Sequence, residues 1–303
     1  SYKLLLLISC TTSKVTGSVK VVSEIKKPLS LKNEGEMELF FIGTGSAFAT
    51  TLFQTNFLII KGDYHILVDF GMTGPSALLG TAGLKASEIE VILPTHSHAD
   101  HVGGIECLGL MNRYIGMRFM NKPKIKMIIS EEYQRVLWDC TLRGGMEWNE
   151  QEIESGRKLS FGDYFQVIRP KWKKSQPREV FEIDFNDIHL EMFRVKHTPE
   201  SANDWQESFI GHGLFIDDKV FISGDTRFDL DLINMYKDKA QVMFHDVQFF
   251  KGGVHTSLDE LKTLPSEVKE KMFLMHYPDE WTKQNIDGFA GWAKQGSRYI
   301  FSL

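Results

Sequence analysis

The chain has 303 residues, 42% of them hydrophobic and 25% charged, which is the composition of a globular protein with one large domain or two closely joined halves. Lysine and arginine number 35 against 40 aspartates and glutamates, and the net charge of −5 excludes a broad basic surface for a long polyanion. Three scattered cysteines exclude a disulfide framework and a thiolate metal site, and no apolar run reaches the roughly 20 residues of a membrane-spanning helix.

Residues 1–36 are expected to form an extension ahead of the folded domain. They open with the apolar run KLLLLISC, whose residues 7–10 resemble a bacterial lipoprotein processing site. The alternative is a simple hydrophobic strand, because the run is shorter than most signal cores. Membrane anchoring in the cell envelope is expected only if Cys10 is lipidated, and a cytoplasmic protein is expected otherwise. Regular patterning begins near Met37, so we expect residues 37–303 to form the domain.

Short strands and helices alternate in the first half of this domain. The runs MELFFIG, NFLII, HILVDFG and EVILPT are rich in β-branched and aromatic residues and end at Gly, Asp or Pro, as buried strands do. Lys61-Gly62-Asp63 predicts a hairpin turn between two of them. Apolar spacing predicts helices over residues 74–84, 103–117 and 131–142, the last of them after the strand KIKMIIS.

The second half of the domain continues the alternation. Asn186-Asp187 and Asp217-Asp218 predict the turns of two further hairpins. The strands QVMFHDV, KMFLMHY and RYIFSL then alternate with expected helices over residues 257–264 and 283–293. No short internal repeat and no low-complexity tract interrupts this order. The interleaving predicts an α/β fold.

Ionisable side chains follow the ends of several predicted strands: Asp69, the segment from His96 to His101, His197, Asp225 and His276. Loops at one edge of a sheet are where layered α/β proteins assemble their sites. His96 and His98 are two residues apart, so they project the same way from an extended segment, whereas Asp100 and His101 lie past the bend and face a second position. Imidazole and carboxylate donors without cysteine suit Zn²⁺, Mn²⁺ or Fe, but not Ca²⁺.

The order H-x-H-x-D-H, followed by a distant His, an Asp and a last His, resembles the metallo-β-lactamase superfamily over nearly all of residues 37–303. The resemblance implies a four-layer αβ/βα sandwich with the metal site at one edge, and two divalent ions, of which Zn²⁺ is expected and Mn²⁺ is the alternative. One ion would be held by His96, His98 and His197 and the other by Asp100, His101 and His276, with Asp225 bridging the two. Asp69, in LVDFG, resembles the residue that orients the metal loop. Such a centre hydrolyses its substrate with a bridging hydroxide.

The sequence around Asp225 indicates which branch of the superfamily the chain resembles. An Asp where β-lactam-hydrolysing members carry Cys argues against that activity. The segments SGDTR, FHDVQFF and VHTS resemble the transfer-RNA 3′-end endonucleases (ribonuclease Z), which carry a His before Ser or Thr between the bridging Asp and the last metal His. That position is His255 here. In phosphodiester hydrolysis His255 would protonate the leaving oxygen, with Asp100 as its partner and second catalytic residue.

The chain departs from ribonuclease Z where RNA is held. Asp225 follows His197 by only 28 positions, which leaves room for one hairpin but not for the long arm of those enzymes. The basic run RPKWKKSQPR, residues 169–178, is either a local phosphate or RNA patch or a solvated loop. Without the arm, the sequence is similar to small phosphodiesterases, including the phage and bacterial anti-Pycsar enzymes that open cyclic mononucleotides.

The leading hypothesis is therefore a dinuclear phosphodiesterase for a small cyclic nucleotide, and the resemblance also implies a homodimer. Trp205, Phe209 and His212 are candidates for stacking on the substrate or lining its pocket, with core packing as the alternative. A ribonuclease Z-like RNA endonuclease is one alternative function. A lactonase or thioesterase would use the same metals on a carbonyl group. A nucleic-acid-binding module without catalysis would depend on the basic run.

Overall fold

The structure, a computed structural model, describes residues 13–16 and 19–301. Cys10, and with it the predicted lipidation site, lies outside the described residues. In the described ranges, none of the helices combines the length and the apolar character that crossing a membrane requires.

The described strands form two sheets. The first has nine strands in the spatial order β1-β2-β17-β3-β4-β5-β6-β7-β8. Their bounds are β1 (Ser13–Thr16), β2 (Val19–Val22), β3 (Met37–Gly43), β4 (Asn56–Lys61), β5 (Tyr64–Val68), β6 (Val91–Leu93), β7 (Ile125–Ile128), β8 (Phe165–Ile168) and β17 (Arg298–Phe301).

The second sheet has eight described strands in the order β16-β15-β14-β13-β12-β11-β10-β9. Their bounds are β9 (Lys171–Lys174), β10 (Val180–Phe185), β11 (Ile188–Arg194), β12 (His212–Ile216), β13 (Val220–Ile222), β14 (Val242–Asp246), β15 (Met272–Met275) and β16 (Gly291–Trp292).

Short helices and helical turns connect these strands. The α-helices are α1 (Gly74–Ala77), α2 (Ala99–Val102), α3 (Ile105–Met111), α4 (Glu131–Leu137), α5 (Arg143–Met146), α6 (Phe161–Tyr164), α7 (Leu230–Tyr236), α8 (Leu258–Lys262) and α9 (Ser266–Lys269). Other helical turns are η1 (Leu78–Ala82), η2 (Ala86–Glu88), η3 (Asn112–Met117), η4 (Trp138–Leu142), η5 (Glu147–Asn149) and η6 (Asp279–Lys283). The helices predicted over residues 74–84, 103–117, 131–142 and 257–264 are confirmed by α1 with η1, α3 with η3, α4 with η4, and α8.

Strand β3 shows why the sheets pack face to face. All seven of its residues are buried, and alternate side chains point to opposite faces of the sheet. Leu39 and Phe41 belong to the core between the two sheets, whereas Phe40 and Ile42 belong to the core beneath the helices. Across the sandwich, the ring centroids of Phe41 and Phe244 of β14 lie 5.0 Å apart. A strand buried on both faces reads as a continuous apolar run, as MELFFIG does.

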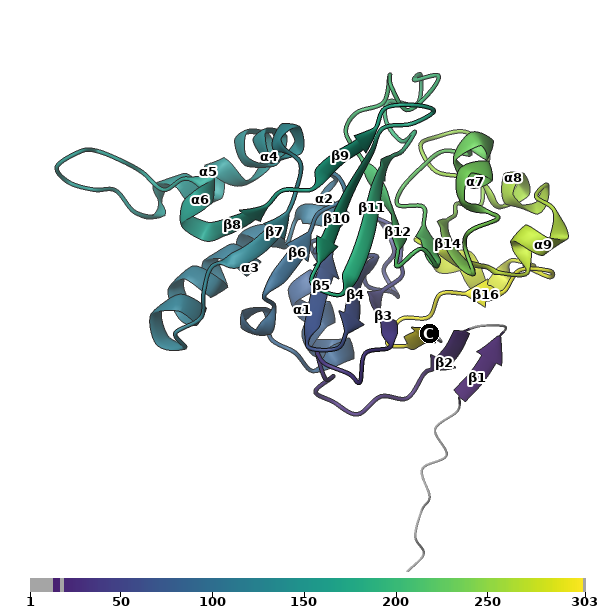
Figure 1. The fold of residues 1–303 in the computed structure, drawn as a ribbon, viewed down its shortest axis with the longest axis horizontal. Coiled ribbons are helices and arrows are strands. Elements are labelled where there is room, and N and C mark those ends of the chain that lie inside the picture. The colour runs from purple at the N-terminus through teal and green to yellow at the C-terminus, as the bar shows by residue number, and fades with distance from the viewer. Residues whose placement is uncertain (1–12, 17–18, 302–303) are drawn as a thin grey trace, which may run out of the picture.

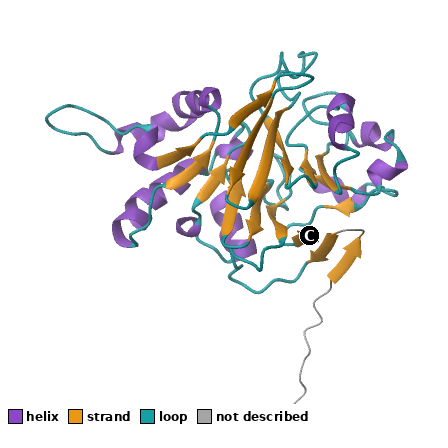
Figure 2. Ribbon diagram, in the orientation of Figure 1, coloured by secondary structure: helices purple, strands orange, loops and turns teal. Residues whose placement is uncertain are grey.

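Helices cover the outer face of each sheet, as Figures 1 and 2 show. Helices α1, α3 and α4 contribute to the apolar core on the first sheet. Helices α7, α8 and α9 contribute to the core on the second sheet. The layers are therefore helix, sheet, sheet and helix, and the predicted αβ/βα sandwich is confirmed.

One edge of the sandwich collects the carboxyl ends of strands from both sheets. Strands β5 to β8 are parallel to one another, and so are strands β13 to β16. Strand β11 runs in the same direction as β13, because both are antiparallel to β12 between them. The loops that follow β5, β6, β11, β13, β14 and β15 therefore meet at this edge, where a site was predicted.

The three predicted hairpins are also confirmed, as β4 with β5, β10 with β11, and β12 with β13. Gly62, Asn186 and Asp217 in their turns have φ angles of 58°, 53° and 50°. A left-handed conformation of this kind is what tight hairpin turns need, and Gly, Asn and Asp adopt it at little cost.

The helix expected over residues 283–293 is wrong. The chain there leaves η6, forms turns and ends in the short strand β16. Gly288 and Gly291 have φ angles of 88° and 144°, which no helix accommodates, so the apolar spacing of this segment reflects packing of a loop.

Part of the predicted extension is integrated into the first sheet. Strand β2 pairs antiparallel with β17, next to β3, and Val19 is buried in the core between the sheets. The division of the chain at residue 36 stays a prediction.

Candidate metal centre

The H-x-H-x-D-H segment wraps around the end of strand β6. His96 and His98 lie in the loop that follows the strand, and helix α2 carries Asp100 and His101. His98 itself is extended, with φ and ψ of −68° and 146°, and the helix begins at the next residue. This change of conformation separates the four side chains into two pairs that serve two different positions.

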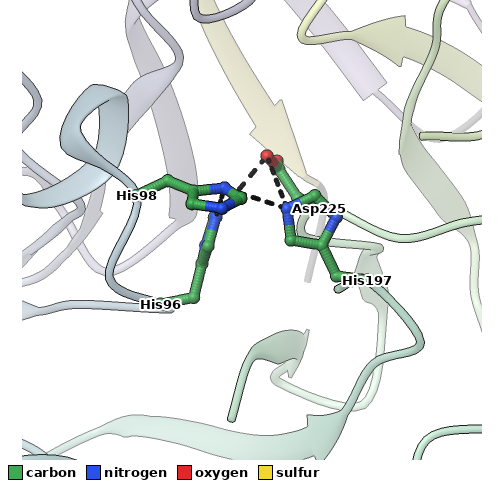
Figure 3. A group of neighbouring side chains, drawn as sticks. All are labelled: His96, His98, His197 and Asp225. Atoms are coloured by element: carbon green, nitrogen blue, oxygen red, sulfur yellow. Dashed lines mark hydrogen bonds and ion pairs between the residues drawn. The ribbon is translucent and has the colours of Figure 1, made fainter. Parts of the chain in front are cut away.

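The first group consists of His96, His98, His197 and Asp225, whose side chains converge in Figure 3. His98 Nδ1 lies 3.1 Å from His96 Nε2 and 3.0 Å from His197 Nε2. Asp225 Oδ2 lies 3.7 Å from His96 Nε2 and 3.9 Å from His197 Nε2. His197 follows β11 and Asp225 follows β13, so the group joins loops of both sheets.

The second group consists of Asp100, His101, Asp225 and His276. His101 Nε2 lies 3.1 Å from Asp225 Oδ2 and 3.2 Å from Asp100 Oδ2. His276 follows β15, and its Nε2 lies 3.1 Å from Asp100 Oδ2 and 3.4 Å from Asp225 Oδ2. The structure thus brings the seven predicted ligands together in the two predicted groups and places Asp225 in both.

The spacing of these atoms suits metal ions. Donors at the corners of a tetrahedron around Zn²⁺, each ~2.0–2.1 Å from the ion, lie about 3.3 Å apart, which falls within the separations seen in both groups. The carboxylates of Asp100 and Asp225 are buried, and because His101 opposes the effect of burial, the pKa of each is held below its usual range, so both are ionised at neutral pH. Burying such charges is costly unless cations compensate them, and two divalent ions would do so. The residues present therefore fit a dinuclear divalent centre.

Burial and charge tune these groups for ligation. Burial lowers the pKa of His197 to about 4 and that of His96 well below its ordinary value, so both imidazoles are neutral, the form that binds a metal. Burial by itself would raise the pKa of Asp225, but His101 and His276 outweigh it and hold this pKa well below the usual range. Asp225 is therefore an ionised carboxylate at neutral pH.

Asp69 is hydrogen-bonded to the segment that carries His96 to His101, and its role in orienting a metal loop stays a prediction. Its carboxylate accepts hydrogen bonds from the Thr95 backbone N–H, the Thr95 hydroxyl and His101 Nδ1, each at 2.7 Å. The last bond leaves His101 Nε2 free to face the second group. Asp69 and His276 both have positive φ, 60° and 56°, a sparsely populated conformation that is often found at functional sites.

Gly71 allows the Asp69 segment to pack closely on helix α2. A Cβ atom at this position would lie 1.9 Å from the backbone oxygen of Asp100, a separation that no side chain tolerates. The neighbouring backbone bonds are Phe70 N–H to His101 O at 2.7 Å and Met72 N–H to Ala99 O at 3.2 Å. The two loops are therefore held in one fixed arrangement.

His255 lies beside both groups, in the loop between β14 and α8. Its Nδ1 is 3.0 Å from Asp246 Oδ2 and 3.9 Å from Asp225 Oδ2. Its hydrogen-bond partner is therefore Asp246, and not Asp100 as expected. Burial alone would lower the pKa of His255, yet the bond to Asp246 and the charge of Asp225 raise it. His197 Nδ1 donates to the carbonyl of Val254 at 2.8 Å, which ties this loop to the first group.

Asp246 is the functional candidate that the sequence reasoning did not identify. It ends strand β14, is fully buried, and also accepts the Thr226 backbone N–H at 3.1 Å. The available signal was an Asp at the exit of the strand QVMFHDV, the same position as the other site residues. The sequence does not reveal the spatial order of the strands, so it does not show which histidine forms a hydrogen bond with Asp246.

None of the three predicted substrate contacts is among the residues that line the cavity beside His255 and His276. Trp205 lines a different cavity, of about 710 Å³, and its indole N–H donates to the carbonyl of Pro177 at 3.3 Å. His212 is buried behind the metal groups, where it lines an internal cavity of about 20 Å³ together with His101. Phe209 is half exposed, and its backbone N–H is bonded to Thr198. The structure does not bring these residues together.

The basic run at residues 169–178 is largely paired with other groups. Lys173 bridges Glu182 and Glu191 at 2.8 and 2.7 Å, and Arg178 is buried against Asp229 at 2.6 Å. Trp172, on edge strand β9, is exposed. Lys171 beside it is exposed as well, so the part of this run that stays open to solvent is small and centres on strand β9.

Comparison with known proteins places the chain in a family. The family profile described as anti-Pycsar protein Apyc1 matches residues 37–299. The chain belongs to the Apyc1 family. It is 34% identical to the anti-Pycsar protein Apyc1 of Paenibacillus sp. (strain J14) over 247 residues, which cover 80% of this chain and 90% of that relative.

Solved structures agree with the fold. The metallo-β-lactamase fold protein YhfI from Bacillus subtilis superposes with a TM-score of 0.63 at 16% identity, covering 88% of this chain and 99% of YhfI. The short form of human tRNase Z superposes with a TM-score of 0.54 at 18% identity, covering 81% of this chain and 94% of that protein. The Apyc1-family chain is a metal-dependent hydrolase of the metallo-β-lactamase fold.

Proposed function

We propose that this protein is a two-metal phosphodiesterase that opens a small cyclic nucleotide, with His255 as the general acid. The observation that carries the proposal is the pairing of His255 with Asp246 beside both metal groups. Because the buried carboxylate fixes Nδ1, the ring orientation is set and Nε2 is the nitrogen left to serve a substrate. Asp246 acts as a positioning residue in this scheme.

Bound divalent ions would polarise the phosphate and supply hydroxide from water at neutral pH. Attack on phosphorus breaks its bond to the 3′ oxygen, and that oxygen takes the proton from His255. Water is thereby added across one P–O bond, and the product is a nucleoside 5′-monophosphate. An alkoxide is a poor leaving group, so a proton donor is valuable here, whereas an activated thioester or a lactone needs one much less. The His255–Asp246 pair therefore favours a phosphodiester over a carbonyl substrate.

Two further observations support a small substrate over RNA. The relatives are anti-Pycsar proteins, and the sequence is similar to enzymes that open cyclic mononucleotides. In the basic run that could have bound RNA, Lys173 is paired with Glu182 and Glu191, and Arg178 is buried against Asp229. The identity of the metal as Zn²⁺ and the homodimer stay predictions.

The proposal is tested by chromatographic product analysis. The metal-loaded protein is incubated with a panel of 3′,5′-cyclic nucleotides, and an Asp225→Ala variant serves as the blank. Linear monophosphates formed by the intact protein alone support the proposal. If no member of the panel is cleaved while precursor transfer RNA or a lactone is, the proposal is wrong.

A further inference from the structure

A cavity of about 500 Å³ opens directly beside the metal centre. His255 and His276 lie in its wall, so it is continuous with the place where a phosphate would react. Two loops form most of the remaining wall, residues 46–49 after strand β3 and residues 247–254 after strand β14, and residues 278–280 complete it. Apart from His255, which directly follows the second loop, neither loop places a candidate metal ligand in the cavity wall. The cavity is therefore available to another part of the substrate.

Each loop exposes one phenylalanine. Phe48 is 92% exposed and Phe250 is 63% exposed, and both line this cavity. A phenylalanine ring left in water forgoes the stabilisation that burial of its apolar surface gives, so two of them in the wall of one cavity beside a catalytic centre indicate a ligand. The ring of Phe250 packs over Gly253, which precedes His255 by two residues. A Cβ atom at Gly253 would lie 3.5 Å from this ring.

The loop that carries Phe48 is anchored by Asp279. The Asp279 carboxylate accepts four hydrogen bonds, from the backbone N–H and the hydroxyl of both Thr50 and Thr51, at 2.6 to 3.0 Å. The Ser46 N–H also donates to the carbonyl of Tyr277 at 3.1 Å. Since Tyr277 follows His276, the position of Phe48 is coupled to that of a predicted metal ligand.

The loop that carries Phe250 is anchored in a similar way. The Gln248 side-chain amide donates to the carbonyl of Phe250 at 2.9 Å and to that of Gly252. The Gly253 N–H donates to Glu200 Oε1 at 2.7 Å. Both aromatic rings therefore sit on loops whose backbone is already ordered, and binding between them would cost little conformational entropy.

We propose that this cavity is the nucleobase subsite and that Phe48 and Phe250 stack on the base, an inference that rests on the proposed function. Among the described residues that line it, the charged side chains apart from histidine are Asp279 and Glu280, and none is Lys or Arg. Acidic groups repel a second phosphate, so the cavity suits one uncharged aromatic base and not a continuing RNA strand. Stacking uses the flat face that every base has, so the subsite tolerates different bases.

The test compares two substrates in four variants. Phe48→Ala, Phe250→Ala and the double variant are assayed beside Phe119→Ala, which removes an exposed ring outside the cavity. One substrate is a 3′,5′-cyclic nucleotide, and the other is the same cyclic sugar phosphate with methyl in place of the base. The single cavity variants should raise KM for the nucleotide about 5- to 150-fold, the range for loss of one stacked ring. Their kinetics on the base-free substrate, and both activities of Phe119→Ala, should stay at the wild-type level.

Unchanged nucleotide KM in the double variant, or equal losses on both substrates, would overturn the subsite. If the proposed function itself is wrong, the wild-type protein will cleave no cyclic nucleotide, and this result separates that failure from a failure of the subsite. In that case calorimetric binding of uridine 5′-monophosphate and of ribose 5-phosphate decides the subsite in the same variants. The subsite predicts that uridine 5′-monophosphate binds more tightly and that Phe48→Ala and Phe250→Ala abolish the difference. Equal binding of the two ligands to wild-type protein would refute it.

Discussion

Replacing Asp69 by Asn is predicted to weaken the second metal site selectively. The Asp69 carboxylate accepts the proton of His101 Nδ1 and two protons of Thr95, all at 2.7 Å. An asparagine has one accepting oxygen and one NH₂ group. If its oxygen keeps the Thr95 N–H, its NH₂ group faces His101 Nδ1, which then has to accept a proton instead of donating one. The proton of His101 moves to Nε2, and this nitrogen can no longer bind a metal.

The magnitude follows from the bond that is lost. A buried hydrogen bond to a charged group contributes about 1.5–3 kcal/mol, which agrees with the roughly 10- to 100-fold loss of metal affinity seen when such supporting partners are removed. The first group should be affected less, because its ligands include no direct partner of Asp69. The backbone is preserved, since Asn adopts the φ of 60° found at this position.

The assay is metal content after dialysis against a series of buffered Zn²⁺ concentrations, measured by mass spectrometry of the metal. The variant should require 10- to 100-fold more free Zn²⁺ to retain its second ion. Asp63→Asn, at an exposed position in the β4–β5 turn, is the matched control and should behave like the wild type. An Asp69→Asn protein that keeps two ions across the same series would refute the reasoning.

Three further predictions concern the shared carboxylate, the general acid and a buried histidine. Asp225→Ala should lower total metal content to one ion or less per chain, because both groups share Asp225; two retained ions would contradict its bridging role. His255→Ala should slow hydrolysis of an alkyl phosphodiester by about 10²- to 10⁴-fold and change hydrolysis of bis(4-nitrophenyl) phosphate little, and equal loss on both esters would rule out the acid role. Burial lowers the pKa of His65 to about 4, so the unfolded chain binds a proton first and stability falls as pH drops from about 6.5 towards 4. In His65→Gln, the amide oxygen can still accept the Glu90 N–H. Between pH 7 and 4.5, the free energy of unfolding of the chelator-treated variant should therefore decrease by roughly 2.5 kcal/mol less than that of the wild type. Equal decreases in the two proteins, measured by urea denaturation, would contradict this.

Much of the fold and of the metal groups could be predicted because their signals are local. Strands such as β3 are short apolar runs, and the left-handed turn at Asn186 is encoded by the residue itself. Asp225 and His276 follow strands directly, and once parallel strands share an edge, residues at their exits are brought together.

The remaining features depend on contacts between distant segments. Asp246 and His255 are near in sequence, but what brings them to the metal groups is the parallel pairing of β14 with β13, which places the loop after β14 beside Asp225. The exposure of Phe48 and Phe250 cannot be read from a sequence, in which a phenylalanine is first expected in the core. Trp205 and His212 appeared close to the site in the sequence, but one faces another cavity and the other is buried behind the ligands.

The most direct test of the central claim is hydrolysis of a 3′,5′-cyclic nucleotide in ¹⁸O-labelled water, followed by mass spectrometry of the product. The account predicts a nucleoside 5′-monophosphate with one ¹⁸O atom on phosphorus, because hydroxide attacks phosphorus and the 3′ oxygen leaves with the proton of His255. Label on the sugar hydroxyl, or a metal-loaded protein that forms no nucleotide product, would contradict it.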